Sequence, residues 1–219
     1  MKKAVEVLLK EGAGETGVIL TEKMIEKFLV FLAELKEWNK VVNLTSLKKD
    51  DSIAVKHFID SLSLVPHLLP GTSLLDLGSG AGFPGIPVKI AKPSIKVTLL
   101  EATRKKVHFQ QHLIRKLCLV EISALQGRAE NLKTEKGITP QFDVVTSRAF
   151  SGLEKFLRSG VPFIKKGGSL IAMKGKRAEE ELEESRDTLK ALSLEVSKIV
   201  NLQLPVNKEK RCLIFMNKS

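Results

Sequence analysis

Apolar residues recur along the chain at two different spacings, which divide it into a helical part and an α/β part. Across residues 21–39 they lie three and four positions apart, which predicts a long amphipathic helix with Thr21 as its N-terminal cap. A second helix is predicted across residues 51–65, and Pro66 ends the helical part. Residues 1–19 contain three glycines and predict a loose leading segment with room for one short helix.

From Ser73 onward, short apolar runs alternate with helical patterns. We predict strands at residues 74–77, 96–100, 121–125, 142–146 and 169–173, helices at 85–91, 104–117, 152–163 and 179–192, and a turn at 165–168. Two last strands, at 196–203 and 211–216, are expected to pair antiparallel. The fold class expected is therefore α/β, a doubly wound Rossmann-like sheet with a terminal antiparallel β-hairpin and an N-terminal helical extension. We place the extension at residues 1–70 and one compact sheet-forming unit at 71–219.

The stretch LLDLGSGAGFPGI, residues 74–86, joins the first of these strands to the first helix after it. Gly78, Gly80 and Gly82 follow the apolar run at alternate positions, and missing side chains let a nucleotide-like ligand approach the backbone. The spacing from Gly80 to Gly85 also matches the dinucleotide fingerprint. Because glycine turns also follow strands in α/β proteins without a ligand, the spacing by itself leaves a purely structural turn open.

A carboxylate at the end of the second strand favours the ligand-binding interpretation. Glu101 follows the run Val97-Thr98-Leu99-Leu100, at the distance downstream of the glycines that is typical of a ribose-binding acid. A carboxylate at that place can accept protons from both ribose hydroxyls. We therefore expect a nucleotide-like ligand above the carboxyl ends of the first two strands.

Composition adds a second kind of ligand. The 219 residues carry a formal net charge of +11, which favours a polyanionic partner, although a solvated lysine-rich surface is the simpler alternative. The chain contains no Tyr and a single Trp, which argues against an aromatic platform for single-stranded nucleic acid. No apolar run is long enough to cross a membrane, so we expect no membrane partner and a cytoplasmic protein.

Other reactive side chains do not form a recognisable site. Cys118 and Cys212 lack metal-ligand spacing and are expected to be buried, reduced thiols. His108 and His112 are four residues apart on a predicted helix, but the Glu of a zinc-binding HExxH motif is missing. We therefore predict no metal site, and the sequence has no Gly-x-Ser-x-Gly nucleophile turn.

Several separated motifs carry a family resemblance. The glycine turn, the Leu99-Leu100-Glu101 strand end, Gln126-Gly127-Arg128-Ala129-Glu130 and the final hairpin together resemble class I S-adenosylmethionine-dependent methyltransferases. The resemblance is narrowed by Asn43-Leu44-Thr45, His57-Phe58-Ile59-Asp60-Ser61, the Phe-Pro-Gly ending of the glycine turn, Glu101-x-x-x-Lys105-Lys106 and Thr146-Ser147-Arg148-Ala149. Across residues 20–216 the chain thus resembles the bacterial 16S ribosomal RNA guanine-N7 methyltransferases, also called the glucose-inhibited division protein B family.

The resemblance implies S-adenosylmethionine as the cofactor and assigns its contacts. It places the backbone of Gly78 and Gly80, together with Phe83, beside the methionine part. It implies that Glu101, Ala102 and Thr103 meet the ribose, that Ala129 and Glu130 flank the adenine, and that Arg148 closes the methyl-donor end. The residues themselves support the glycines and Glu101, whereas Arg148 could equally form an ordinary ion pair.

The implied reaction is methyl transfer to guanine N7 in 16S ribosomal RNA, as free RNA, in the small ribosomal subunit or in an assembly intermediate. Guanine N7 has a free lone pair at neutral pH, so no catalytic general base is expected. Arg148, Asn43 and His57 are candidates for positioning the reactants. A structural cluster of His57, Asp60 and Ser61 that docks the helices on the sheet is the alternative. We expect the protein to act as a monomer.

Two basic clusters are candidates for RNA phosphates. They are Arg104, Lys105 and Lys106 at the start of a predicted helix, and Lys174, Lys176 and Arg177 after the fifth strand. Cations in the first turn of a helix oppose its dipole, so the first cluster needs an anion nearby, either RNA phosphate or a carboxylate such as Glu101. Both clusters are expected at the same edge of the sheet.

Three other functions remain open from the sequence. A small-molecule methyltransferase would keep its activity at high salt, since its basic clusters would not be needed for binding. A nicotinamide-dependent oxidoreductase would use the same glycine turn and bind a dinucleotide in place of S-adenosylmethionine. A non-catalytic ribosome-assembly factor would keep the fold and the RNA contacts without turnover.

Overall fold

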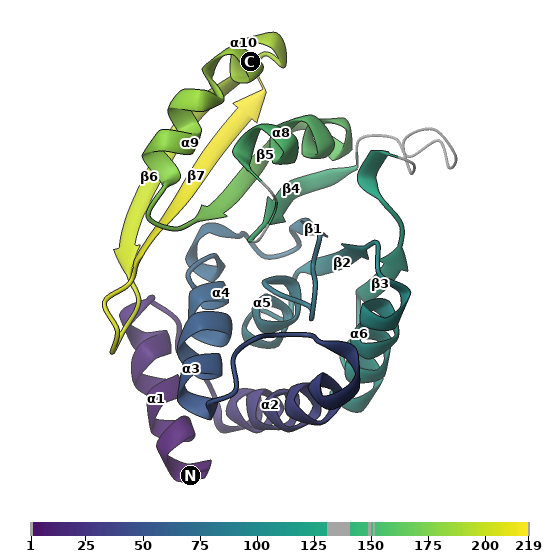
Figure 1. Ribbon diagram of the computed structural model, residues 1–219, viewed down its shortest axis with the longest axis vertical. Helices are drawn as coiled ribbons and strands as arrows, with labels where there is room; N and C mark the ends of the chain where they lie inside the picture. The colour runs from purple at the N-terminus through teal and green to yellow at the C-terminus, as the bar shows by residue number, and fades with distance from the viewer. Residues whose placement is uncertain (1, 131–140, 149, 151, 219) are drawn as a thin grey trace.

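A sheet between two layers of helices forms the centre of the molecule (Figure 1). The computed structural model describes residues 2–130, 141–148, 150 and 152–218. The strands in these ranges are β1 Ser73–Leu77, β2 Lys96–Glu101, β3 Ile122–Gln126, β4 Phe142–Ser147, β5 Ile164–Lys174, β6 Leu194–Gln203 and β7 Lys210–Lys218. They lie in the order β3-β2-β1-β4-β5-β7-β6. Strands β1 to β5 pair in parallel, and β7 runs antiparallel between β5 and β6. The predicted doubly wound sheet and its terminal antiparallel hairpin are confirmed.

Alternating side chains of each central strand enter two separate hydrophobic cores. In β1, Leu74 belongs to one core and Leu75 and Leu77 to the other, as expected for a strand buried on both faces. The first core contains side chains of α5 Gly85–Ala91 and α6 Arg104–Lys116, and the second contains side chains of α8 Leu153–Gly160, α9 Ala178–Glu184 and α10 Arg186–Ala191. The ligand-facing edge, at the carboxyl ends of the parallel strands, is therefore supported from both sides.

The N-terminal helices form an outer layer over the first core. Helix α2, Glu22–Val42, packs against α5 and α6, and the Thr21 hydroxyl accepts the predicted capping bond from Met24 N at 3.3 Å. The helix for which residues 1–19 had room is present as α1 Lys2–Glu15, but the segment is not loose. It buries Val5, Leu9 and Ala13, one residue per turn, in the same core as α2 and the sheet.

The second predicted helix contains an unexpected wide turn. It begins as α3 Asp50–Ile53, continues as a π-helical segment η1 Ala54–Ile59 and ends as α4 Asp60–Leu62, before a short 3₁₀ turn η2 Val65–His67. The amide N–H of Asp60 donates to both His57 O and Val55 O, so the wide turn closes at Asp60. π-helical turns are often retained at functional sites, and this one carries His57.

Other element boundaries differ from the predicted ones where a side-chain hydrogen bond or strand pairing outweighs the local sequence pattern. The helix predicted across 179–192 is divided at Ser185, whose buried hydroxyl donates to Glu181 O at 2.7 Å. The turn predicted at 165–168 lies inside β5, where the pairing of β5 with β4 is irregular.

Cys118 is exposed, against expectation, and Cys212 is buried as expected. None of the helices that the structure describes is long and apolar enough to cross a membrane.

Candidate active site

The glycine loop after β1 has a backbone that only glycine adopts without strain. Gly78, Gly80 and Gly82 have φ values of 68°, 57° and 90°, in the left-handed region. A Cβ atom on Gly78 would also lie 3.3 Å from the Phe150 ring. The predicted glycine turn thus brings its backbone to the carboxyl ends of β1 and β2, where Gly78 N donates to Leu100 O at 2.8 Å.

Three buried polar side chains hold this loop. Glu101 Oε2 accepts from Gly80 N at 2.9 Å, and Asp76 Oδ2 accepts from Gly85 N at 2.8 Å. Gln110, on α6, donates from Nε2 to Gly80 O at 2.8 Å. Asp76 and Gln110 were not identified from the sequence as site residues. A charged residue inside the apolar run of β1 is a signal for Asp76, whereas Gln110 has none.

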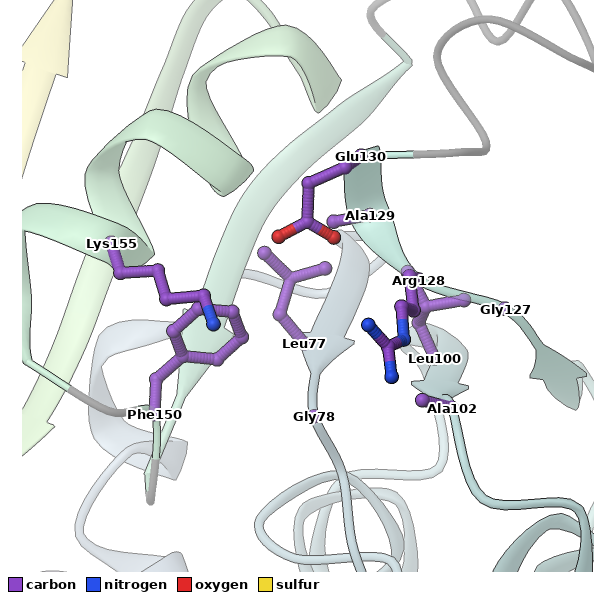
Figure 2. Close-up of a pocket in the computed structure, with 10 residues that line it drawn as sticks. All are labelled: Leu77, Gly78, Leu100, Ala102, Gly127, Arg128, Ala129, Glu130, Phe150 and Lys155. Atoms are coloured by element: carbon purple, nitrogen blue, oxygen red, sulfur yellow. The ribbon is translucent and has the colours of Figure 1, made fainter.

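A pocket of about 290 Å³ opens beside the loop (Figure 2). Four residues that the family resemblance assigns to the cofactor line it: Gly78, Ala102, Ala129 and Glu130. Sequence analysis missed the other lining residues, which are Leu77, Leu100, Gly127, Arg128, Phe150 and Lys155. Figure 2 shows Glu130 and Arg128 on one side of the pocket and Lys155 beside the Phe150 ring on the other.

Glu101 lies at the end of β2, next to this pocket, and is only 7% exposed. Its Oε1 accepts from Thr103 N at 2.8 Å, in addition to the bond from Gly80. A carboxylate can accept about four hydrogen bonds, so two acceptor positions are left for ligand hydroxyls. Thr103 is therefore placed beside Glu101, as the resemblance implies.

Phe83 does not line the pocket, because its ring is buried between the loop and the N-terminal helices. It stacks on Phe31 with ring centroids 5.1 Å apart and on His57 at 4.6 Å. The Arg148 guanidinium carbon lies 4.9 Å from its centroid. Phe83 thus connects α2, η1 and the residue that follows β4.

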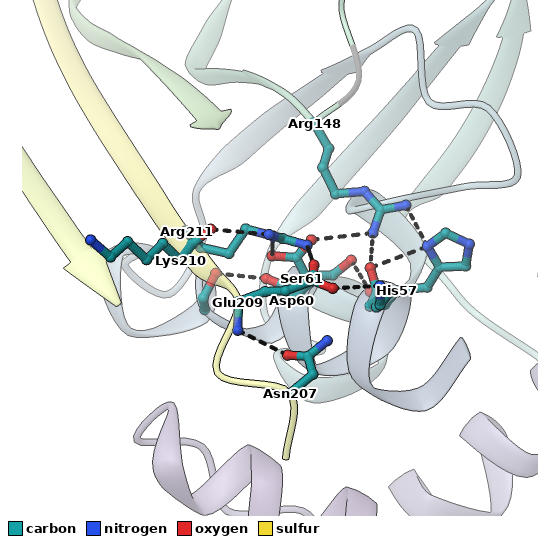
Figure 3. A network of polar contacts seen from close by, with 10 residues as sticks. His57, Asp60, Ser61, Arg148, Asn207, Glu209, Lys210 and Arg211 are labelled. Carbon is teal, nitrogen blue, oxygen red and sulfur yellow. Dashed lines mark hydrogen bonds and ion pairs between the residues drawn. The ribbon is translucent and has the colours of Figure 1, made fainter. Parts of the chain in front are cut away.

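Arg148 follows β4 and enters a polar cluster instead of the pocket (Figure 3). Its guanidinium donates to Lys56 O at 2.7 Å and to His57 Nδ1 at 2.9 Å, and it lies 3.5 Å from Asp60 Oδ2. Arg211, at the start of β7, approaches the other Asp60 oxygen at 3.2 Å. Three segments far apart in the sequence therefore meet around the Asp60 carboxylate.

These contacts determine the tautomer of His57. Arg148 can only donate, and at 2.9 Å its contact is the shorter one, so His57 Nδ1 accepts and the ring proton lies on Nε2. Lys56 O, 3.2 Å from the same nitrogen, then receives no hydrogen bond from it. The Nε2–H group then donates to the Thr45 hydroxyl at 2.8 Å. Burial, and then the charge of Arg148, lower the pKa of His57 to about 3, so the ring is neutral at physiological pH. Both of its nitrogens are already bonded within the protein.

Asn43, the remaining positioning candidate, begins the loop that carries Thr45. It adopts the left-handed conformation that ends α2, with φ of 52°. Asn39 holds the loop by accepting from Leu44 N at 2.6 Å and from Thr45 N at 2.9 Å. The structure therefore brings the 43–45 segment to the polar cluster through Thr45.

The two basic clusters differ. Arg104 and Lys105 are exposed, Lys106 is half-buried, and none of the three forms an ion pair with a residue that the structure describes. In the second cluster, Lys174 is 8% exposed and bonded to Glu181 at 2.7 Å. Arg177 pairs with Glu180 at 2.7 Å, and Lys176 is exposed. Among the described residues, the first cluster therefore has more cations without a carboxylate partner than the second.

Asp76 is a buried acid with a strongly perturbed pKa. It is fully buried, and its Oδ1 atom has no hydrogen-bond partner among the described residues. Burial raises its pKa to about 7, against the bond from Gly85 N. The Ser147 hydroxyl, at the end of the neighbouring strand β4, is also buried without a partner in the described part of the chain. Unused polar atoms therefore gather at the carboxyl ends of β1 and β4.

Solved structures with a similar fold include methyltransferases. A SAM-dependent methyltransferase from Aquifex aeolicus matches 80% of this chain and 96% of its own, with a TM-score of 0.59 and 19% identity. The M1A22 tRNA methyltransferase TrmK of B. subtilis matches 73% of this chain and 65% of its own, with a TM-score of 0.58 and 16% identity. At these identities the likeness establishes the fold alone.

Sequence relatives are much more similar. A ribosomal RNA small subunit methyltransferase G from Geobacter sp. (strain M21) is 41% identical over the whole of both chains. The protein of that name from Acetivibrio thermocellus is 42% identical, over 96% of this chain and 87% of its own. The family model described as GidB, rRNA small subunit methyltransferase G, matches residues 24–212. The chain therefore belongs to the rRNA small subunit methyltransferase G family.

Proposed function

We propose that this protein is an S-adenosylmethionine-dependent methyltransferase that methylates guanine N7 in 16S ribosomal RNA. The observation that carries the proposal is the pocket beside the glycine loop, with Glu101 at its edge, in a chain of this family. Relatives that are 41% and 42% identical bear the name of small-subunit ribosomal RNA methyltransferases. The acceptor atom is inferred from the family resemblance and from the chemistry of the site.

The residues at the sheet edge fit S-adenosylmethionine. Glu101 has two acceptor positions left for the ribose hydroxyls, and Ala129 and Glu130 line the place assigned to adenine. The buried Oδ1 of Asp76 and the hydroxyl of Ser147 offer unused polar atoms near the methionine end. S-adenosylmethionine supplies a methyl group made electrophilic by a positively charged sulfur.

The cluster around Arg148 supports transfer without a general base. His57 is neutral and has both nitrogens bonded, so it is poorly placed to remove a proton. Guanine N7 needs no deprotonation, and holding the reactants in line can supply about 7 to 11 kcal/mol of the barrier. Arg148, His57 and Asn43 accordingly act by position in this proposal, with His57 acting through Arg148.

The start of α6 supports an RNA substrate. Arg104 and Lys105 are exposed next to Glu101 and oppose the helix dipole, which costs about 0.3 to 1 kcal/mol for each charge. An RNA phosphate bound there would remove that cost. This exposed pair favours RNA over a small metabolite as the methyl acceptor.

Mass spectrometry of 16S ribosomal RNA from cells with and without the protein tests the proposal. We expect a single 7-methylguanine to disappear when the protein is absent and to return with the purified protein and S-adenosylmethionine. Unchanged RNA would favour the non-catalytic assembly factor. Binding of a nicotinamide dinucleotide in place of S-adenosylmethionine, measured by fluorescence titration, would favour the oxidoreductase.

A further inference from the structure

Gln110 is a buried amide on α6, and only one of its two polar atoms is bonded. It is 0% exposed, and Val107 and Leu113, about one turn to either side, are buried as well. Its Nε2 donates to Ser79 Oγ and to Gly80 O, both at 2.8 Å. Its Oε1 has no hydrogen-bond partner among the described residues. A buried acceptor without a partner lowers the free energy of unfolding, a cost that an apolar side chain of similar size would avoid.

We propose that Gln110 is a positioning residue for S-adenosylmethionine, because it fixes the direction of the Gly80 peptide group. The inference rests on the function proposed above and adds a residue that does not line the pocket assigned to the cofactor. Gln110 does not contact the cofactor in this proposal. It makes the fold less stable than an apolar residue would, and it makes cofactor binding tighter.

Two side chains from different elements hold Gly80, one on each side of its Cα atom. Glu101 Oε2, at the end of β2, accepts from Gly80 N at 2.9 Å, and Gln110 Nε2 donates to Gly80 O. Gly80 has a φ of 57°, and a glycine populates positive and negative φ about equally well. The two bonds therefore select one loop conformation among several, and Gln110 supplies one of them.

The bond to Gly80 O also orients the amide that follows it. A trans peptide group is planar, and its C=O and N–H point in opposite directions. Since the Gly80 carbonyl points to α6, the N–H of Ala81 points away from that helix. Ala81 is only 3% exposed, and its N–H has no hydrogen-bond partner in the described part of the chain. Buried amides nearly always have a partner, so we expect this one to meet an acceptor atom of the cofactor.

Loss of the Gln110 bond should act on cofactor binding through the population of the competent loop. When only a fraction of the molecules has the binding conformation, the apparent dissociation constant rises by the inverse of that fraction. A loop that is competent in one molecule out of five or fewer would bind at least five times more weakly. The fold itself does not need this bond, because Gln110 leaves one of its own buried atoms unpaired.

Gln110→Met removes both bonds and the unpaired oxygen with little change of shape. Methionine forms helices well and adapts to irregular space, so the variant should fold. Gln111→Met is the matched control, because Gln111 is the next residue of α6 and its Nε2 donates to Ala124 O on β3, at 3.3 Å. Ser79→Ala removes one of the two bonds of Gln110 and leaves the bond to Gly80 O. Gln110→Leu replaces Gln110→Met if that variant does not fold.

The measurements are calorimetric binding of S-adenosylmethionine, denaturant unfolding of the ligand-free protein, and single-turnover methyl transfer to small ribosomal subunits from cells that lack the protein. For Gln110→Met we expect a dissociation constant at least five times that of the parent. The unfolding midpoint should be equal to or above that of the parent, and the transfer rate at saturating cofactor should stay within a factor of two. Gln111→Met and Ser79→Ala should bind the cofactor within a factor of two of the parent.

Three results would overturn the role of Gln110. Unchanged affinity in Gln110→Met with a lower unfolding midpoint would make it a structural residue only. Unchanged affinity with a slower rate at saturating cofactor would place its effect on the transfer step. An equal loss of affinity in Ser79→Ala would show that the effect passes through Ser79 and not through Gly80. Failure of the parent protein to bind S-adenosylmethionine would instead refute the proposed function.

Discussion

Replacing Glu101 with Gln turns one carboxylate oxygen into an amide group, which cannot accept the N–H of Gly80 or Thr103. We expect cofactor affinity to fall by about 1.5 to 3 kcal/mol, because a charged acceptor for ribose hydroxyls is removed. Calorimetric titration measures this, and Glu121→Gln, at an exposed ion pair with Lys96, is the control. Affinity equal to that of the parent protein would remove Glu101 from the cofactor site. The melting temperature should fall as well, since Glu101 is buried and bonded to the loop.

A rise in pH should destabilise the fold through Asp76. Its carboxyl group has a pKa of about 7 in the folded chain and about 3.8 when unfolded, because burial favours the protonated form. The folded chain therefore binds more protons between these values, and stability falls from about pH 4 to pH 7, by about 1.4 kcal/mol for each unit of raised pKa. Burial also raises the pKa of Asp60, and the lowered pKa of His57 acts in the opposite direction below about pH 6.5, so the contribution of Asp76 is read from the difference between Asp76→Asn and the parent. In denaturant unfolding, this difference should shift in favour of Asp76→Asn between pH 5 and pH 8.

Asp143 is the matched control for Asp76, since its shift has the opposite sign. Burial opposes the shift, but bonds from Lys165 and Ser73 lower the pKa of Asp143 to about 2. Stability from Asp143 is present above about pH 4 and is lost as the pH falls towards 2. The stability of Asp143→Asn relative to the parent should therefore stay constant between pH 5 and pH 8. A stability of Asp76→Asn relative to the parent that is also constant over this range would exclude a raised pKa of Asp76.

The proton on His57 Nε2 makes Thr45 important for the reaction. Thr45→Val removes the acceptor of that proton and frees the ring that holds Arg148, so we expect slower single-turnover transfer at unchanged cofactor affinity. Thr45→Ser keeps the hydroxyl and should restore the rate. The rate of the parent, with saturating cofactor, should be level from about pH 6 to 9, a window in which a catalytic His would titrate. A titrating limb abolished by His57→Ala or Asp60→Asn would contradict both the acceptor atom and the positioning role.

The site could be predicted from the sequence where a residue type has few alternatives. Glycines in the left-handed region and an acid after β2 leave a clear pattern, and both were predicted. Gln110 left no such signal, because a glutamine on a helix surface and one buried under a loop look alike in sequence. The partners of Arg148 come from η1 and β7, so tertiary packing alone brings them together.

At the scale of elements, the start of α6 should contribute more to RNA binding than the stretch after β5. Replacing Arg104 and Lys105 with Glu should weaken RNA binding. The plot of the logarithm of the RNA-binding constant against the logarithm of salt concentration should become less steep, by about 0.7 to 0.9 for each phosphate that is no longer bound. Lys176→Glu should have a smaller effect. Lys10→Glu with Lys23→Glu makes the same change of net charge on α1 and α2, as a control. A slope that is the same in all variants would mean that these charges are only solvated.

Most elements were predicted because the spacing of their apolar residues and the residue types at their ends indicate the same boundaries. Helix α5 spans the predicted residues, and its neighbours differ from prediction by a few residues at most. The wide turn in η1 was missed because the sequence 54–59 is compatible with an ordinary helix. The break at Ser185 depends on a buried hydroxyl bond, and the continuation of β5 through 165–168 depends on its pairing with β4. Neither leaves a local pattern.

The whole molecule should unfold as a unit that includes its N-terminal helices. Leu9 on α1 is fully buried in the core shared by α2, α5, α6 and the sheet. Leu9→Ala should lower the free energy of unfolding by about 2 to 5 kcal/mol and keep a single transition in circular dichroism and fluorescence. Ile19→Ala, at a side chain that is 91% exposed, is the control and should change little. Separate transitions by the two probes would show that residues 1–70 unfold independently.

The reversed direction of β7 has a consequence for how the protein is made. A parallel strand presents its last residue at the ligand edge, but an antiparallel strand presents its first, and Arg211 lies at that place. Asp60 precedes β1 in the sequence, so every strand from β1 to β6 is synthesised before Arg211 can reach it. A nascent chain can therefore form the parallel sheet well before the cluster around Arg148 is complete. Competence for methyl transfer should arrive late in translation, after most of the fold is in place.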